Sequence, residues 1–395
     1  MSADSSDLNV KRSALNVERS ASAADADNPW PGLAPFTEDQ SRLFFGRDAE
    51  IKTLSRRVQG DPLTVLFGQS GLGKSSLLQA GVFPRLRSAD FCPVYIRLDH
   101  SPGAPPLTEQ VKAIVSTATA AAGRWTRPGA AGPSLWEFFH HRDNRLVSPG
   151  GIALSPVLVF DQFEELFTLG AQARNSDLGG RRSVGAGEVD TEDSAATEPV
   201  RQAQGPEPVE GRSPPTGSGD TGRQRAVAFM TELAELVENR PPDALVARVE
   251  QSAAELDALD FGANAYRVII TLREDYLPHL ESLKAIMPTL MDNRMRLSRM
   301  NGVQALEAVV KPGAGLVTEE VARAIVEFVS GARGGSVERL AELDVEPPLL
   351  SVICRELNER RRALGQTQIT ADLVTGNRRE ILTDFYERSV ADLPA

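Results

Sequence analysis

The sequence LTVLFGQSGLGKSS, residues 63–76, decides the fold. Its first part, residues 63–67, is a short apolar run of the kind that forms a buried β-strand. Residues 68–75 then fit the pattern G-x-x-x-x-G-K-[S/T], and a helix is predicted from Lys74 to Gly81. A strand, a glycine-rich loop and a helix in this order predict a loop that wraps phosphate groups.

Each residue type in this loop has a chemical reason. The predicted phosphate-binding residues are Gly68, Gln69, Ser70, Gly71, Leu72, Gly73, Lys74, Ser75 and Ser76. Glycines let backbone N–H groups approach the phosphates, and the N-terminus of the following helix adds positive potential. Lys74 is expected to reach the β- and γ-phosphate oxygens, and Ser75 to ligate Mg²⁺.

A second motif, PVLVFDQFEEL at residues 156–166, supplies carboxylates. Asp161 is the first polar residue after an apolar strand, so it is predicted to hold Mg²⁺ beside Ser75. Glu164 and Glu165 follow within one helical turn, and one of them is expected to activate the attacking water. Gln162 occupies the position where many hydrolytic P-loop ATPases keep glutamate, so the residues alone leave the choice of base open.

The rest of the chain alternates predicted strands with helices and then becomes helical. Apolar strands are predicted at residues 63–67, 93–98, 156–160 and 266–272. Helices between them imply a parallel sheet that binds ligand at the carboxyl ends of its strands. After Met300 only helices are predicted, at 303–310, 319–330, 348–362 and 378–391. The expected fold is α/β, a P-loop NTPase sheet with flanking helices, followed by an all-α subdomain.

Composition divides the chain further. Residues 1–27 predict a disordered tail, 28–300 the P-loop domain and 301–366 the helical subdomain. Residues 171–224 are dominated by Gly, Pro, Ser and charged residues, which predicts a disordered insertion on the surface. Residues 367–395 are expected to begin a truncated winged-helix-like module.

Composition also limits the classes of function. The formal net charge is −11, from 43 basic and 54 acidic residues. This balance disfavours nucleic acid or an acidic membrane surface as the main partner. No apolar run is long enough to span a bilayer, no signal peptide is apparent, and two distant cysteines predict buried thiols in a reducing compartment. A cytoplasmic protein is therefore expected.

Taken together, these segments resemble the bacterial novel STAND NTPases, signalling ATPases related to AAA+ and NACHT-type switches. Five segments carry the resemblance: residues 28–51, called the leading segment, with NPWPGL and FFGRDAEI; the phosphate loop, 68–76; DQFEELF, 161–167; TLREDYL, 271–277; and PPLL, 347–350. The phosphate loop alone identifies a superfamily, whereas the five segments in this order are far more specific.

The resemblance implies roles for further residues. Arg273, at the end of a predicted strand, would read the γ-phosphate, although a surface salt bridge with Glu274 or Asp275 is the alternative. Arg47 would lie near the ribose or phosphates or be structural, and Pro348 would contact the base. Related switches favour Glu165 as the catalytic base. The implied ligands are ATP and Mg²⁺, and the implied partners are sensor or effector proteins, with a nucleotide-dependent homo-oligomer.

Four functions compete. The leading hypothesis is a regulatory switch that binds ATP and hydrolyses it slowly. A P-loop kinase would need an acceptor pocket, and a DNA-loading ATPase would prefer a complete basic winged helix, which this sequence does not display. The fourth hypothesis is a protein that binds ATP without turnover.

Overall fold

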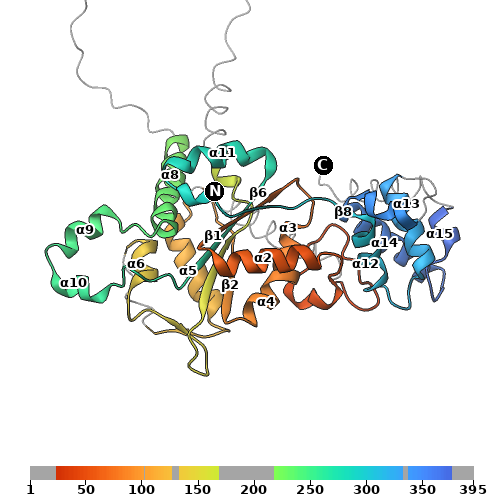
Figure 1. The fold of residues 1–395 in the computed structure, drawn as a ribbon, viewed down its shortest axis with the longest axis horizontal. Coiled ribbons are helices and arrows are strands. Elements are labelled where there is room, and N and C mark those ends of the chain that lie inside the picture. The colour runs from red at the N-terminus through yellow and green to blue at the C-terminus, as the bar shows by residue number, and fades with distance from the viewer. Residues whose placement is uncertain (1–23, 102, 127–132, 169–217, 332–336, 376–395) are drawn as a thin grey trace, which may run out of the picture.

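A five-stranded parallel sheet forms the centre of the α/β part in the computed structural model (Figure 1). The strand order is β2-β5-β6-β1-β7. The strands are β1 (Leu63–Gly68), β2 (Phe91–Ile96), β5 (Ser155–Phe160), β6 (Arg267–Arg273) and β7 (Arg294–Arg296). The structure describes residues 24–101, 103–126, 133–168, 218–331 and 337–375.

The register places the chemistry-bearing residues at one edge. Gly68, the last residue of β1, lies opposite Arg273, the last residue of β6. Phe160, which precedes Asp161, ends β5 beside Ile270 of β6. The sequence analysis did not predict β7, which pairs with β1 through Val65 and Arg294. Because β7 is three residues long and reads Arg-Met-Arg, it lacks the apolar run that marked the other strands.

Helices cover both faces of the sheet. On one face pack α2 (Asp48–Gly60) and the continuous helical stretch α3 (Lys74–Ser76), η2 (Leu77–Val82) and α4 (Phe83–Arg87). On the other face pack α5 (Leu107–Thr119), α6 (Leu135–His140), α8 (Ser218–Val237) and α11 (Leu277–Glu281). Neighbouring strand residues alternate between the two cores; Leu158 faces one and Val159 the other. The helix predicted to end at Gly81 continues to Arg87 through a π-helical segment.

The segments between sheet strands add smaller elements. Two strands of two residues each, β3 (Arg124–Trp125) and β4 (Leu146–Val147), flank α6 and form an antiparallel pair between α5 and β5. Residues 243–258 form two helices, α9 (Asp243–Val249) and α10 (Ala253–Ala258), because Ser252 caps a new start by accepting from the Glu255 amide. Short 3₁₀ turns are η1 (Glu38–Leu43), η3 (Glu274–Tyr276), η4 (Ser282–Ala285) and η5 (Pro288–Met291).

The predicted insertion at 171–224 has a different boundary at its end. Helix α8 begins at Ser218, so the last residues of the predicted insertion are helical. The rest of the insertion, residues 1–23 of the tail predicted at 1–27, and the helix predicted at 378–391 lie outside the described residues.

The helical subdomain has its own core. Its elements are α12 (Gly302–Val310), α13 (Glu319–Ser330), η6 (Val337–Glu342), α14 (Pro347–Ala363) and α15 (Ala371–Thr375). The prediction of helices alone missed a two-residue antiparallel pair, β8 (Met300–Asn301) with β9 (Asp344–Val345). Within the predicted winged-helix-like module, Ile369 and Leu373 pack into this same core.

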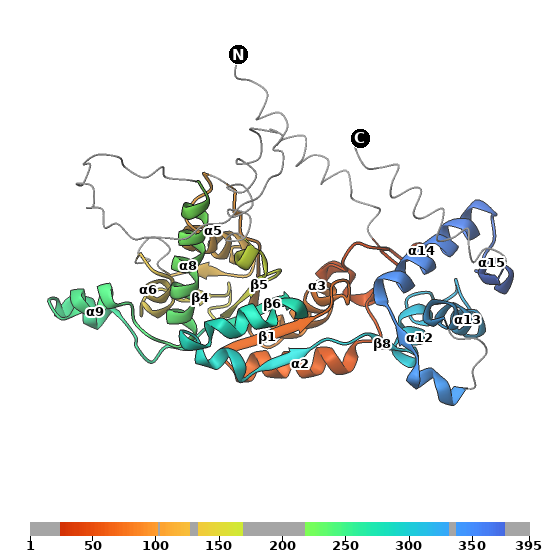
Figure 2. The ribbon, with the colours of Figure 1, turned by 90° about the horizontal axis from the view of Figure 1, so that it is seen from above.

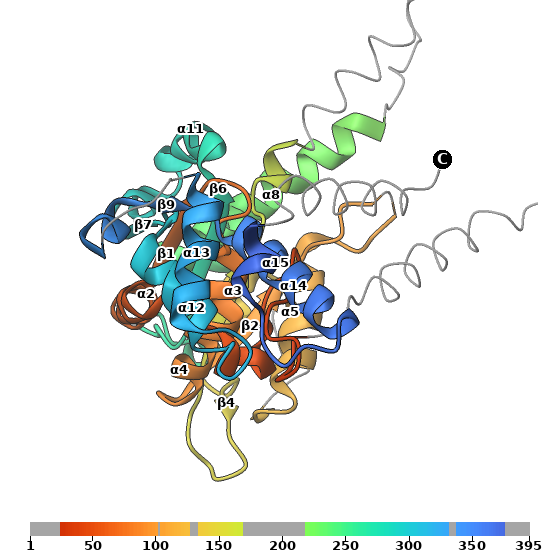
Figure 3. The ribbon, with the colours of Figure 1, turned by 90° about the vertical axis from the view of Figure 1, so that its right-hand side faces the viewer.

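Figures 1 and 2 show the helical subdomain beside one end of the sheet domain, and Figure 3 looks from that end, with the helical subdomain in front. The leading segment connects these two parts. The indole of Trp30 is buried in the helical core and donates to the carbonyl oxygen of Ala308 at 3.3 Å. Glu50 of α2 accepts from Gln304 of α12 at 2.9 Å. The two parts therefore meet through specific polar and apolar contacts beside the phosphate loop.

Candidate functional site

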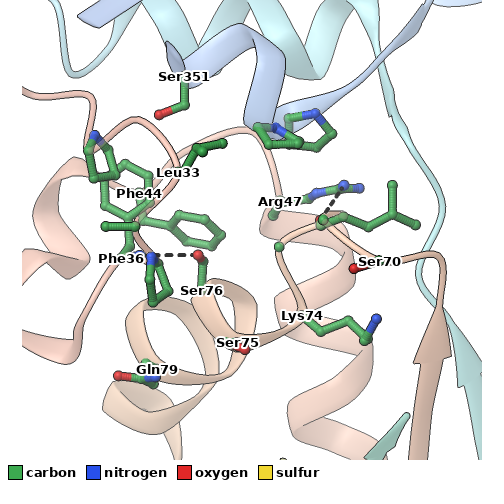
Figure 4. Close-up of a pocket in the computed structure, with 18 of the residues that line it drawn as sticks. Leu33, Phe36, Phe44, Arg47, Ser70, Lys74, Ser75, Ser76, Gln79 and Ser351 are labelled. Carbon is green, nitrogen blue, oxygen red and sulfur yellow. Dashed lines mark hydrogen bonds between the residues drawn. The ribbon is translucent and has the colours of Figure 1, made fainter. Parts of the chain in front are cut away.

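A cavity of about 600 Å³ lies between the sheet domain and the helical subdomain. The carboxyl ends of β1, β5 and β6 open into it, as expected for a parallel α/β sheet. Figure 4 shows the phosphate loop with Lys74 below Arg47, while Ser351 of α14 reaches the cavity from the helical subdomain. We call this cavity the nucleotide cavity.

The phosphate loop has the backbone that its glycines permit. Gly71 and Gly73 have φ values of +80° and +85°, which side-chain-bearing residues rarely adopt. Lys74 curls over the loop, and its Nζ donates to the carbonyl oxygens of Gly68 at 2.9 Å and Gln69 at 3.0 Å. Burial lowers the pKa of Lys74, while the negative charges of Glu164 and Asp161 oppose that shift. The ammonium group is therefore held at the mouth of the loop.

Asp161 is the centre of a hydroxyl network. Its Oδ2 accepts from Ser75 Oγ at 2.7 Å and also from the Tyr95 hydroxyl. Its Oδ1 accepts from Thr271 Oγ1. Three elements thus fix one carboxylate: the helix after the phosphate loop, β2 and β6. Burial, followed by the negative charge of Asp161, raises the pKa of Tyr95 far above its usual range, so this hydroxyl stays a donor.

The two glutamates of the acidic motif point to different places. Glu164 lines the nucleotide cavity, and its buried Oε2 has no hydrogen-bond partner in the part of the chain that the structure describes. Burial raises its pKa, and the charge of Lys74 counteracts part of that rise. Glu165 is not among the cavity residues; its carboxylate is 53 % exposed and lies 4.0 Å from His100 Nε2. Gln162 between them and the strand adopts a φ of +60°, which turns the chain at this point.

Arg273 lies where the sequence placed it, at the end of β6 and in the cavity wall. Its guanidinium also forms the alternative salt bridge, with Asp275 at 2.6 Å. The side chain is half exposed, so this pair is solvent-screened and contributes little to stability. The guanidinium is therefore available to exchange Asp275 for another anion in the cavity.

Arg47 is held by protein groups. Its side chain is 3 % exposed, pairs with Glu50 at 2.8 Å and donates to the carbonyl oxygens of Ser298 at 2.9 Å and Leu72 at 3.5 Å. Burial lowers its pKa, although Glu50 opposes the shift. Of the two roles considered for Arg47, these contacts fit the structural one, because they link Leu72 of the phosphate loop to Glu50 of α2 and to Ser298 after β7.

The leading segment and the proline turn complete the cavity. The amide of Phe36 donates to Ser76 Oγ at 3.1 Å, and the amide of Gly32 donates to Ser351 Oγ at 2.9 Å. The first bond reaches the phosphate-loop helix and the second reaches α14. Pro348, at the start of α14, lies so close to the loop that a Cβ on Gly71 would be 3.4 Å from its Cγ. The helical subdomain therefore lies close beside the phosphate loop.

Sequence reasoning missed Tyr95 and Thr271. Both lie within predicted strands, and each has a feature that could have indicated a role in the site. Thr271 is polar inside an otherwise apolar strand, and Tyr95 lies near the carboxyl end of β2. Neither type of residue belongs to the phosphate-loop pattern, so only the three-dimensional pairing of β2, β5 and β6 brings them to Asp161.

A phosphate loop whose serine, Ser75, donates to an aspartate at the end of a neighbouring strand, Asp161, is the arrangement that defines a P-loop NTPase. A family model described as Novel STAND NTPase 1 matches residues 29–373. The chain therefore belongs to this family of novel STAND NTPases. No curated protein matched the chain.

Solved structures give weaker similarities. Cdc6p from Pyrobaculum aerophilum is 12 % identical with a TM-score of 0.44, covering 88 % of this chain and 70 % of that one. The ORC2 protein of Aeropyrum pernix, in ADPNP-ADP complexes, is 11 % identical with a TM-score of 0.42 and coverages of 88 % and 71 %. Drosophila ORC bound to DNA is 11 % identical with a TM-score of 0.43 and coverages of 95 % and 70 %.

Two further features are absent from the described residues. Among them, no helix combines the length and apolarity needed to cross a membrane. In the same part of the chain, no three His, Cys, Asp or Glu side chains gather as a metal site. The second result is compatible with Mg²⁺, which commonly takes one or two protein oxygens and completes its shell with phosphates and water.

Proposed function

We propose that this chain binds ATP with Mg²⁺ in the nucleotide cavity, hydrolyses it slowly and acts as a nucleotide-dependent switch. One observation carries the proposal: Lys74, the Ser75–Asp161 pair, Glu164 and Pro348 of the helical subdomain line the same cavity. Phosphate-binding, carboxylate and subdomain-contact groups in one space are what a switch requires, because the bound nucleotide then touches both parts that must move.

The donor set fits Mg²⁺. Ser75 Oγ and Asp161 Oδ2 are oxygens 2.7 Å apart at the first turn of the phosphate-loop helix, and Mg²⁺ prefers oxygen ligands. Ser75 and Asp161 would hold the ion, Asp161 directly or through water. When bound, the ion would neutralise charge on the phosphate oxygens. Tyr95 and Thr271 keep the Asp161 carboxylate oriented toward Ser75.

We infer that Glu164, rather than Glu165, activates the attacking water. Its buried Oε2 has no donor among the described residues, and a water molecule would supply one. Its position in the cavity wall supports the role, whereas Glu165 lies beside His100 outside that wall. Lys74 and Arg273 would stabilise negative charge that develops on the γ-phosphate. The apolar side chains of Leu33, Phe36 and Phe44 would accommodate the base.

The decisive experiment measures nucleotide binding and turnover together. ATP and ADP binding are followed by thermal shift and calorimetry, and phosphate release is followed with and without Mg²⁺. ATP at about 100 times its Kd stabilises by roughly 2.7 kcal/mol. That shift should disappear in Lys74→Ala, whereas the matched control Lys112→Ala, on α5 and outside the cavity, should keep it. An unchanged shift in Lys74→Ala would refute the assignment of the phosphate loop.

A kinase would transfer phosphate to an acceptor, so ATP would be consumed without release of free phosphate. ATP consumption is therefore measured separately from phosphate release, with and without candidate acceptors. Binding without release would instead make the chain a nucleotide-binding protein without turnover. As part of the switch we also propose sensor or effector partner proteins and a nucleotide-dependent homo-oligomer. The homo-oligomer is tested by sizing the protein with ATP, with ADP and without nucleotide.

A further inference from the structure

A second cavity, of about 280 Å³, lies at the amino-terminal ends of β5 and β6, opposite to the strand ends that open into the nucleotide cavity. Ser155, the first residue of β5, and Tyr266, which immediately precedes β6, are in its wall. The other walls come from the loop after α6 and the segment after α10. Asp161 and Arg273 lie at the far ends of the same two strands, so this cavity is separate from the nucleotide cavity.

Asn144 holds one wall of this cavity in place. The residue is 3 % exposed, and its Nδ2 donates to the carbonyl oxygen of Phe138 at 2.8 Å. The Oδ1 of the same amide is buried and has no hydrogen-bond partner among the residues that the structure describes.

Two cations flank Asn144 in the sequence and line the same cavity. Arg142 donates through Nε to the carbonyl oxygen of Leu259 at 2.8 Å, and Arg145 donates through Nε to the carbonyl oxygen of Arg142 at 3.1 Å. These bonds fix the stems of both side chains. Their terminal nitrogens have no partner within the part of the chain that the structure describes. A guanidinium edge of this kind matches a carboxylate.

Other parts of the wall supply the anion Asp260, the imidazoles of His140 and His141, and aromatic surface. The Asp260 carboxylate lines the cavity, and its Oδ1 accepts from the Gly262 amide at 3.1 Å. Trp125, Phe139 and Tyr266 form a connected aromatic wall, with ring centroids 6.1 Å and 5.2 Å apart along that order. The cavity thus presents acceptors, fork-shaped donors and apolar surface to one small ligand.

We propose that this second cavity binds a small zwitterion of the α-amino acid class. The carboxylate pairs with Arg142 and Arg145, the ammonium group pairs with the Asp260 carboxylate, and an apolar side chain packs on the aromatic wall. A simple anion would face Asp260, so this carboxylate selects for the ammonium group.

The test uses the full chain and a panel of the standard L-amino acids in a thermal-shift assay, followed by calorimetry of those that stabilise. At least one apolar amino acid should raise the melting temperature by about 2–4 °C near saturation. Its amide or methyl ester lacks the carboxylate, and its N-acetyl form lacks the ammonium group. Both derivatives should bind about tenfold to a hundredfold more weakly.

Variants locate the site. Arg142→Gln and Arg145→Gln alter exposed side chains, so both should fold, and each should weaken binding about tenfold or more. Arg85→Gln, an exposed arginine outside the cavity, should bind as the wild type does. Lys74→Ala should also keep the amino-acid shift.

Three results would overturn the proposal. One is that no amino acid stabilises the chain. Another is that N-acetyl and free forms bind equally, so the cavity recognises an anion and not a zwitterion. The last is that the shift disappears in Lys74→Ala and persists in both arginine variants, which would place the ligand in the nucleotide cavity.

Discussion

Glu164 lies in the wall of the nucleotide cavity, while the side chain of its neighbour Glu165 lies outside that wall, beside His100. The turn at Gln162, with its φ of +60°, sets this difference because it fixes the direction in which the following residues leave the sheet. Two adjacent carboxylates that look equivalent in the sequence therefore have different surroundings, and substitution separates their roles.

Glu164→Gln should keep ATP bound and slow phosphate release by about 10²–10⁴-fold, the usual contribution of a general base. Glu165→Gln is the matched control, because it makes the same chemical change one residue away and should retain near wild-type turnover. Single-turnover phosphate release on both variants, with ATP retention measured in parallel, is the test. Loss of turnover in Glu165→Gln alone would assign the base to Glu165.

Glu164→Gln should also raise the melting temperature of nucleotide-free protein at neutral pH. Burial raises the pKa of Glu164 above its ordinary 4.5, so the folded state binds this proton more tightly than the unfolded state does. The ionised form therefore destabilises the fold above the raised pKa, and this cost disappears below about 4.5. The difference in melting temperature between variant and wild type should shrink as pH falls. A constant difference would mean that packing, not charge, causes it.

Tyr95→Phe tests the hydroxyl network around Asp161. The variant keeps the ring but removes one donor to Asp161 Oδ2, leaving those from Ser75 and Thr271. We expect the Mg²⁺ concentration for half-maximal ATP hydrolysis to rise about tenfold, since a hydrogen bond to a charged group contributes roughly 1.5–3 kcal/mol. Tyr266→Phe, which removes a buried hydroxyl bonded to the Leu236 carbonyl oxygen, should lower stability without changing the Mg²⁺ requirement. Equal Mg²⁺ curves for Tyr95→Phe and wild type would contradict a positioning role.

The sequence predicted the parts of the site that follow fixed local patterns. The phosphate loop, the strand-end Asp161 and the strand-end Arg273 depend on a strand, a turn and the parallel order of the sheet, all of which leave apolar runs and glycines in the sequence. The α/β fold and the family were confirmed for the same reason. Contacts that join distant segments, such as Tyr95 with Asp161 or Trp30 with Ala308, leave no local periodicity and could not be predicted.

Element boundaries failed where tertiary contacts outweigh local pattern. β7 is a strand because β1 offers it a free edge, not because Arg-Met-Arg favours extended backbone. The helix after the phosphate loop continues past Gly81. A Cβ at this residue would lie 2.6 Å from Ile51, so only glycine lets α2 approach so closely. Glycine therefore marks close packing at this position and not the end of the helix.

Arg273→Ala should reduce ATP affinity about tenfold and leave ADP affinity nearly unchanged, because the guanidinium lies at the cavity wall and would meet the terminal phosphate. Asp275→Asn removes the competing partner of Arg273 and should raise ATP affinity or leave it unchanged. Calorimetry with both nucleotides on both variants distinguishes these effects. An equal loss for ATP and ADP in Arg273→Ala would show that the side chain supports the cavity and does not sense the γ-phosphate.

Trp30→Ala should destabilise the chain by about 3–5 kcal/mol, the usual cost of removing a buried aromatic side chain. Trp30 is 3 % exposed, and a Cβ on Gly313 would lie 2.7 Å from the indole, so the ring has no room to shift. Gly313→Ala fills that contact from the other side and should destabilise as well, by about 1–3 kcal/mol.

If the leading segment couples the two parts, both variants should weaken ATP binding although neither residue carries a phosphate-binding group. Chemical denaturation and calorimetry under conditions where each variant is folded provide the comparison. Destabilisation with wild-type ATP affinity would limit Trp30 to a packing role in the helical core.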